Sequence, residues 1–251
     1  MKCDLCVLCI AVFVLAMGTT TLHAQNRLVL GYRGDTKALH AVISTRIITE
    51  AYGRMGIEIE AQGFPGPRSQ SKANRGAIDG ELFEGNISRD EFPNLIQVPV
   101  PILYSEIVVF TKDVEFKVMG WDSLKPYKIG IQIGIKEAES GTNGLQLEPV
   151  ASAEQLFMKL AAGRNDIVVL PRNLGLKVLK TVGTQRPEGI NLKDFQGITA
   201  LDPPLQREAL YHYLHSKHAE IVPKITAVLQ EMEKEGLIQR IKEEVEANFF
   251  K

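Results

Sequence analysis

Charged and aromatic side chains stand directly after several apolar runs of the sequence, where they could hold a small polar molecule. Tyr32 and Arg33 end the first run (RLVLGYR), and Asp35 follows shortly after. Open α/β sheets bind ligands at the carboxyl ends of their strands, so we expect Tyr32 and Arg33 to line a ligand site. Asp35 has two interpretations, as a ligand contact or as the N-cap of the following helix.

Three cations occupy similar positions further along the chain. Arg89, Lys136 and Arg172 each follow the end of an expected strand. Guanidinium and ammonium groups donate charge-assisted hydrogen bonds to carboxylates and phosphates, so their convergence would create a site for an anionic ligand group. The alternative is that each is an ordinary solvated loop residue.

Glu81 and Tyr104 complete the set of candidate ligand contacts. Glu81 lies within an expected strand, where a carboxylate is costly unless it is paired or lines a polar cavity. It could instead face water from an edge strand. Tyr104 could stack on a ligand or pack at a hinge.

The sequence offers little support for catalysis or metal binding. His212, His215 and His218 recur at three-residue steps, but His212 and His215 would point to opposite faces of a strand. We therefore expect no metal site. The sequence contains no nucleophile-elbow, Walker, dinucleotide-binding or zinc-protease motif, and we expect neither enzymatic activity nor a cofactor.

The first 24 residues have the layout of a secretory signal peptide. Lys2 supplies the positive charge, Cys6 to Met17 is an apolar run, and Gly18 to Ala24 is mostly small or polar. The apolar run falls well short of the ~20 residues needed to cross a bilayer. We expect cleavage before Gln25, a periplasmic location and no membrane insertion afterwards.

Composition excludes several partners for the exported chain. Cys3, Cys6 and Cys9 all lie within the signal, and the bulky Val7 and Leu8 before Cys9 argue against lipid attachment. A mature chain without cysteine has no disulfide or thiolate chemistry. The net charge of -1 suggests neither nucleic acid nor an anionic membrane as partner, and we expect a monomer.

The order of strands and helices predicts an α/β protein. A strand, an amphipathic helix and a second strand over residues 27–61 form a βαβ unit, followed by a loop at Gly63 to Gly66. A second α/β unit begins near residue 112, with Ser152 and Gln155 as a capping box for its helix. Further strands are expected at residues 77–83, 95–100, 105–111, 128–134, 166–170 and 207–215, and helices after Pro171, Ala219 and Gly236.

Three segments carry a family resemblance, and they are Asn74 to Leu82 (NRGAIDGEL), Leu124 to Gly134 (LKPYKIGIQIG) and Glu154 to Val169 (EQLFMKLAAGRNDIVV). They resemble the family-3 bacterial extracellular solute-binding proteins, which include the periplasmic receptors of polar amino-acid ABC importers. Each segment alone is a weak motif. Their order and spacing are more specific.

The resemblance implies a two-lobed periplasmic-binding-protein fold of type II, with two chain crossings and a ligand cleft between the lobes. Lobe 1 would comprise residues 25–110 and 200–251, and lobe 2 residues 111–199. The crossings would fall near Val109 to Lys112 and near Ile198 to Asp202. Hinge closure on a ligand would then be read by an ABC permease or a membrane receptor.

The family's ligand chemistry does not transfer to this chain residue by residue. The arginine that clamps an α-carboxylate corresponds to Glu91, and the threonine of the second lobe corresponds to Ile135, with Lys136 after it. Pro171 stands where an acid would meet an α-amino group. We therefore expect a small polar, anionic solute captured for an importer.

Two alternatives stay open. The same fold could sense a ligand for a membrane receptor. It could also resemble dehydratases of small carboxylates, with Glu81 as general acid or base at a raised pKa.

Overall fold

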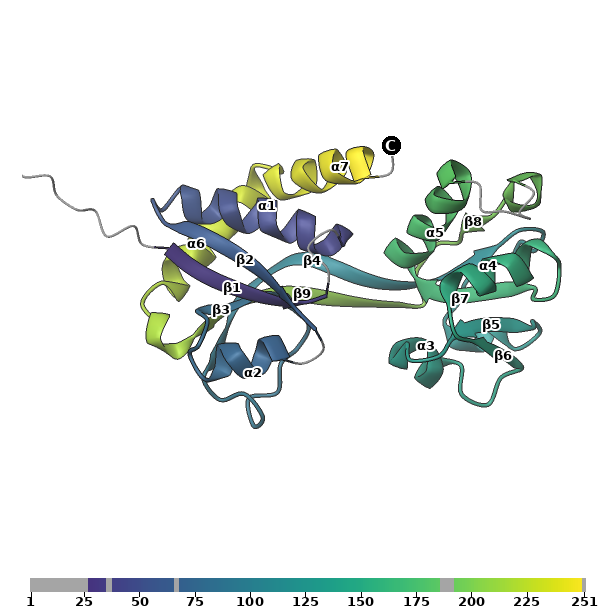
Figure 1. The fold of residues 1–251 in the computed structure, drawn as a ribbon, viewed down its shortest axis with the longest axis horizontal. Helices are drawn as coiled ribbons and strands as arrows, with labels where there is room; N and C mark the ends of the chain where they lie inside the picture. Colours follow the sequence, from purple (N-terminus) through teal and green to yellow (C-terminus); the bar gives the residue numbers. More distant parts are fainter. Residues whose placement is uncertain (1–26, 35–37, 66–67, 186–191, 250–251) are drawn as a thin grey trace, which may run out of the picture.

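The computed structural model describes residues 27–34, 38–65, 68–185 and 192–249. The expected signal peptide and Asp35 lie outside these residues. Figure 1 shows two α/β lobes joined by two long antiparallel strands. The strands are β1 (Arg27–Arg33), β2 (Glu58–Phe64), β3 (Gly80–Glu84), β4 (Leu95–Thr111), β5 (Ile129–Gln132), β6 (Leu147–Val150), β7 (Ile167–Pro171), β8 (Thr199–Ala200) and β9 (Gln206–His215). The α-helices are α1 (Leu39–Gly53), α2 (Arg68–Asn74), α3 (Lys136–Gly141), α4 (Ala153–Ala161), α5 (Arg172–Gln185), α6 (Val222–Lys234) and α7 (Leu237–Phe249), and the 3-10 helices are η1 (Trp121–Leu124), η2 (Leu192–Phe195) and η3 (Ser216–His218).

The first lobe is a sheet with helices on both faces. β1 pairs in parallel with β2 and β3, and β3 pairs antiparallel with β9. Successive side chains of a strand point to opposite faces, so Leu28, Leu30 and Tyr32 enter the core beneath α1, α6 and α7, whereas Val29 packs beneath α2. Figure 1 shows α2 on the opposite side of the sheet from α1 and α7.

β4 and β9 carry the chain between the lobes. The sequence suggested two strands, at residues 95–100 and 105–111, but β4 is one continuous strand of 17 residues. Proline lacks the N–H that a ladder requires, and the pairing of β4 with β9 shifts register on either side of Pro101. The prolines therefore interrupt the ladder without ending the strand.

The second lobe repeats the layered arrangement. β5 pairs in parallel with β6 and β7, and β7 pairs antiparallel with β4. Residues 167–170 of β7 are fully buried, as the apolar sequence DIVVL predicted. α4 and α5 cover one face, and η1 and α3 cover the other. The expected N-cap of α4 is confirmed, because the Ser152 hydroxyl accepts a hydrogen bond from the Gln155 amide at 3.3 Å.

The hydrophobic clusters of each lobe show where the chain passes from one lobe to the other. Leu103 and Leu210 pack in a cluster of the first lobe, whereas Ile107 and Leu205 pack in a cluster of the second. Both changes fall closer to the middle of the β4 and β9 ladder than the crossings expected from sequence. We propose residues 104–106 and 206–209 as the hinge.

Two short helices were not expected. The helices are α2, which begins at Arg68, and α3, which begins at Lys136, and β2 runs to Phe64, into the loop expected at residues 63–66. α2 buries Ser69 and Ala73 and α3 buries Ala138, so neither carries the apolar periodicity that marks a helix in sequence. No helix within the described ranges is long and apolar enough to cross a membrane.

Candidate functional site

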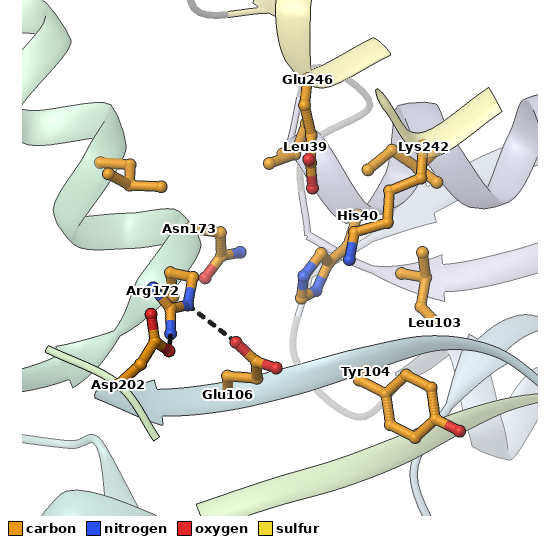
Figure 2. A pocket seen from close by; sticks show the side chains of 12 residues that line it. Leu39, His40, Leu103, Tyr104, Glu106, Arg172, Asn173, Asp202, Lys242 and Glu246 are labelled. Atoms are coloured by element: carbon orange, nitrogen blue, oxygen red, sulfur yellow. Dashed lines mark hydrogen bonds and ion pairs between the residues drawn. The ribbon is translucent and has the colours of Figure 1, made fainter. Parts of the chain in front are cut away.

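A cavity of about 470 Å³ lies between the lobes, beside the crossing strands. It opens at the ends of α1 and α5, the helices that follow the carboxyl ends of β1 and β7, where α/β sheets place ligands. Figure 2 shows charged side chains approaching it from both lobes. Its lining comprises Leu39, His40, Ile43, Leu103, Tyr104, Glu106, Arg172, Asn173, Leu176, Asp202, Lys242 and Glu246.

Arg172 is the cation that the second lobe supplies. It is the first residue of α5, directly after β7. Its Nε donates to Glu106 at 2.7 Å and its Nη2 donates to Asp202 at 2.5 Å, as the dashed lines in Figure 2 mark. Glu106 lies on β4 within the proposed hinge, whereas Asp202 lies between Leu201 and Leu205, which pack in the second lobe.

The first lobe supplies a second cation on the opposite wall. Lys242 of α7 extends toward His40 of α1 in Figure 2. Burial, followed by the charge of Lys242, lowers the pKa of His40 to about 4, so this imidazole is neutral at pH 7. Within the described part of the chain, Lys242 forms no ion pair with a carboxylate.

The floor of the cavity combines an aromatic ring with aliphatic side chains. Tyr104 on β4 is 39% exposed, and the Arg207 guanidinium carbon lies 3.7 Å from its ring centroid. Leu39, Leu103 and Leu176 supply apolar surface beside it. The cavity thus offers charged groups at its walls and an apolar floor for a small hydrocarbon skeleton.

The lobes also touch beyond the crossing strands. Lys180 of α5 donates a hydrogen bond to the backbone carbonyl of Phe249 at the end of α7, and its Nζ lies 5.9 Å from the Phe249 ring centroid. This contact joins α5 of the second lobe to the end of α7 of the first.

Two residues expected at the site, Tyr104 and Arg172, line this cavity. Tyr32 does not, contrary to expectation. It is 1% exposed and stacks on Phe83, with ring centroids 5.9 Å apart, inside the core of the first lobe. Tyr32 has the same strand parity as Leu28 and Leu30, so it points inward with them.

The other expected cations lie outside the cavity lining. Arg33 is exposed and pairs with Glu84 at 3.1 Å, and the same Glu84 oxygen accepts a hydrogen bond from Gln70. Arg89 and Lys136 are exposed on the loop after β3 and at the start of α3. The structure therefore does not bring Arg89, Lys136 and Arg172 together around this cavity.

Glu81 has neither of the placements that the sequence suggested. Its side chain is 0% exposed, and both carboxyl oxygens lie within 2.8 Å of the Ser69 hydroxyl of α2. Burial raises the pKa of Glu81 to about 8, although the Ser69 hydrogen bond opposes this shift. A solute in the cavity cannot reach this carboxyl, so the dehydratase alternative loses its proposed acid or base.

The histidines have separate environments. The backbone carbonyl of Glu81 accepts from His212 Nδ1 at 2.7 Å, so the remaining ring nitrogen accepts from the Tyr52 hydroxyl at 3.0 Å. His218 instead contacts Asp79 at 2.8 Å. Across the described ranges, no three His, Cys, Asp or Glu side chains are close enough to hold a metal ion.

The sequence did not predict six of the eight polar residues that line the cavity. No sequence pattern marked Lys242 or Glu246 of α7 as a ligand contact, because the charged face of a final helix looks like an ordinary solvated face. Glu106 sits in an apolar strand, and Asp202 sits in a proline-rich turn. The missed polar residues are His40, Glu106, Asn173, Asp202, Lys242 and Glu246.

Comparison with known protein sequences finds a relative of similar length. No family model matches the chain. An uncharacterised protein of Shewanella oneidensis MR-1 is 28% identical over 244 residues, covering 94% of this chain and 89% of that protein. The alignment with this relative spans nearly the whole chain.

Solved structures of similar shape are two-lobed binding proteins and sensor domains. An ancestral cationic amino-acid solute-binding protein has a TM-score of 0.61 at 15% identity, covering 90% of this chain and 96% of its own. A histidine kinase sensor domain with similarity to periplasmic binding proteins has a TM-score of 0.58 at 15% identity, with coverages of 88% and 96%. The VFT2 domain of Bordetella pertussis BvgS has a TM-score of 0.55 at 14% identity, with coverages of 87% and 93%. The chain has the two-lobed α/β fold of periplasmic binding proteins, which confirms the expected fold class.

Proposed function

We propose that this chain is an exported solute-binding protein that closes its lobes around a small polar solute carrying an anionic group. The observation that carries the proposal is the pair of cations on opposite walls of the cavity, Arg172 from the second lobe and Lys242 from the first. A carboxylate between them would be attracted to both lobes at once. Its binding would favour the arrangement in which the lobes are closest.

The size and lining of the cavity support a small ligand. A volume of about 470 Å³ falls within the ~300–1,000 Å³ common for small-molecule sites. Neutral His40 and Asn173 can exchange hydrogen bonds with hydroxyl or amide groups of the solute. The apolar floor would hold its carbon skeleton.

We propose a periplasmic location and an ABC-type permease as the partner that accepts the closed form. Sensing for a membrane receptor is the second candidate, and it is favoured by the sensor domains among the structural neighbours. Adjacent permease and ATPase genes would support transport. An adjacent gene for a membrane receptor would support sensing.

A ligand screen tests the proposal. Thermal shift against amino acids, dicarboxylates and other small anions should reveal a ligand, because binding to the native state raises the melting temperature. Arg172→Ala and Lys242→Ala should each weaken that ligand about tenfold by calorimetry, which equals ~1.4 kcal/mol. Lys125→Ala is the matched control, since Lys125 is an exposed cation away from the cavity. Unchanged affinity in both cavity variants would contradict the proposal.

A further inference from the structure

Arg172 is already occupied on two sides by carboxylates of the protein. Glu106 accepts from Nε and Asp202 accepts from Nη2. A guanidinium presents its five N–H groups in one plane, and carboxylates bind it best through two parallel hydrogen bonds. An anionic solute must therefore compete with these two residues for Arg172.

The two carboxylates differ in how firmly they are held. The Glu106 side chain is 25% exposed and lies 3.6 Å from Arg207, its partner across the β4–β9 ladder. The Asp202 side chain is 72% exposed, and among the described residues its ion pair is with Arg172. Asp202 is consequently the group that a solute would displace, while Glu106 stays between its two arginines.

We infer that Asp202 and Glu106 are specificity-determining residues that hold Arg172 as an internal substitute for the carboxylate of the solute. This inference rests on the proposed function and adds the class of solute that the site selects. A solute that accepts two hydrogen bonds from the guanidinium can displace Asp202, whereas an anion that accepts a single hydrogen bond cannot. The site thereby selects carboxylate-bearing solutes over chloride-like monoatomic anions.

The Glu106 contact links Arg172 to the hinge. Arg172 and Asp202 both belong to the second lobe, because Leu201 and Leu205 on either side of Asp202 pack in its core, whereas Glu106 lies in the proposed hinge on β4. Displacing Asp202 therefore frees Arg172 for the solute, while Glu106 keeps Arg172 joined to the hinge.

Calorimetry with defined probes tests the specificity claim. The probes are succinate, L-glutamate and chloride, added to the wild-type protein, Asp202→Asn and Glu106→Gln. Each variant keeps the shape of the side chain and removes its charge. Asp202→Asn should therefore bind succinate or L-glutamate about fivefold more tightly than wild type, and Glu106→Gln should also bind them more tightly.

The matched control for Asp202→Asn is Asp122→Asn. The control for Glu106→Gln is Glu148→Gln, because Glu148 also pairs with two cations, the lysines at 2.8 and 3.0 Å. If a probe binds wild type and both cavity variants with equal affinity, the inference is overturned while the proposed function stands.

A measurement without ligand separates the two claims. Cys3, Cys6 and Cys9 are first replaced by Ser. Spin labels are then attached at two exposed positions, Met158→Cys in lobe 2 and Lys234→Cys in lobe 1, and they report the distance between the lobes. Glu106→Gln should broaden the distance distribution, because it weakens the contact between Arg172 and the hinge, and Glu148→Gln should leave it unchanged. If no probe binds the wild type, the anionic-solute proposal fails. A distribution in Glu106→Gln identical to wild type would then overturn the inference as well.

Discussion

Glu81 shows how a carboxyl can be buried inside an α/β lobe with a hydroxyl as its hydrogen-bond partner. Ser69 provides its hydrogen bond, and α2 covers it from the solvent side. Because burial disfavours the ionised form, the folded-state pKa of Glu81 is about 8 against an ordinary value of 4.5. The carboxyl is therefore mostly protonated at neutral pH in the folded protein.

This shift predicts a pH dependence of stability. Between pH 4.5 and 8 the folded state binds a proton at Glu81 that the unfolded state has lost, so the stabilising contribution is complete below 4.5 and disappears as the pH rises through 8. Glu81→Gln stays neutral throughout. Relative to wild type, the variant should gain stability from pH 5 to pH 9, on the order of a few kcal/mol at ~1.4 kcal/mol per pKa unit.

Urea unfolding at pH 5, 7 and 9 measures this difference directly. Glu148→Gln is the control, because two lysines lower the pKa of Glu148 to about 2 and its titration ends below this range. A stability difference between Glu81→Gln and wild type that stays constant from pH 5 to 9 would show that Glu81 is ionised in the fold.

Strand-end position predicted some site residues and misplaced others. Arg172 follows β7 and lines the cavity, because strand-end residues there face the space between lobes. Tyr32 occupies a similar position, but its strand parity sends it into the core. Lys242 could not be foreseen, since its role depends on how α7 packs across α1, a long-range contact that no local pattern encodes.

At the scale of elements, α5 approaches the sheet unusually closely. A Cβ built on Gly175 would lie 2.2 Å from Phe110, a fully buried ring that contacts Phe157 edge to face at 5.2 Å. Gly175 therefore sets the distance between α5 and β4. Because α5 begins with Arg172, this spacing also positions the cavity cation.

Two glycine substitutions should have opposite effects on stability. Gly175→Ala should destabilise the fold by ~1–3 kcal/mol, because the added methyl group overpacks a rigid core. Gly53→Ala at the end of α1, where no atom lies within 4 Å of the new Cβ, should stabilise it by ~0.5–1 kcal/mol through a less flexible unfolded chain. Thermal unfolding compares the two, and a neutral or stabilising Gly175→Ala would contradict the close packing of α5.

Elements with strong apolar patterns were predictable, and short ones were not. α4, with Ser152 as its cap, and the buried β7 follow from local residues alone. α2 and α3 each bury one or two small residues and depend on neighbouring strands for their stability. The continuity of β4 depends on its long pairing with β9, which overrides its prolines.

At the scale of the whole molecule, the hydrophobic clusters of the two lobes are separate, and β4 and β9 join the sheet between the lobes. This arrangement lets each lobe move as a unit while the crossing strands absorb the change. The resemblance noted in the sequence predicted this two-lobed plan. The position of the hinge required the packing of Leu103 and Ile107 in different cores.

Closure around a bound solute is the central claim, and small-angle X-ray scattering tests it most directly. The radius of gyration should fall when the wild-type protein is saturated with the solute found by thermal shift. In the Arg172→Ala, Lys242→Ala double variant it should stay unchanged at the same solute concentration. A wild-type radius of gyration that does not change at full occupancy would show that the lobes do not close on their ligand.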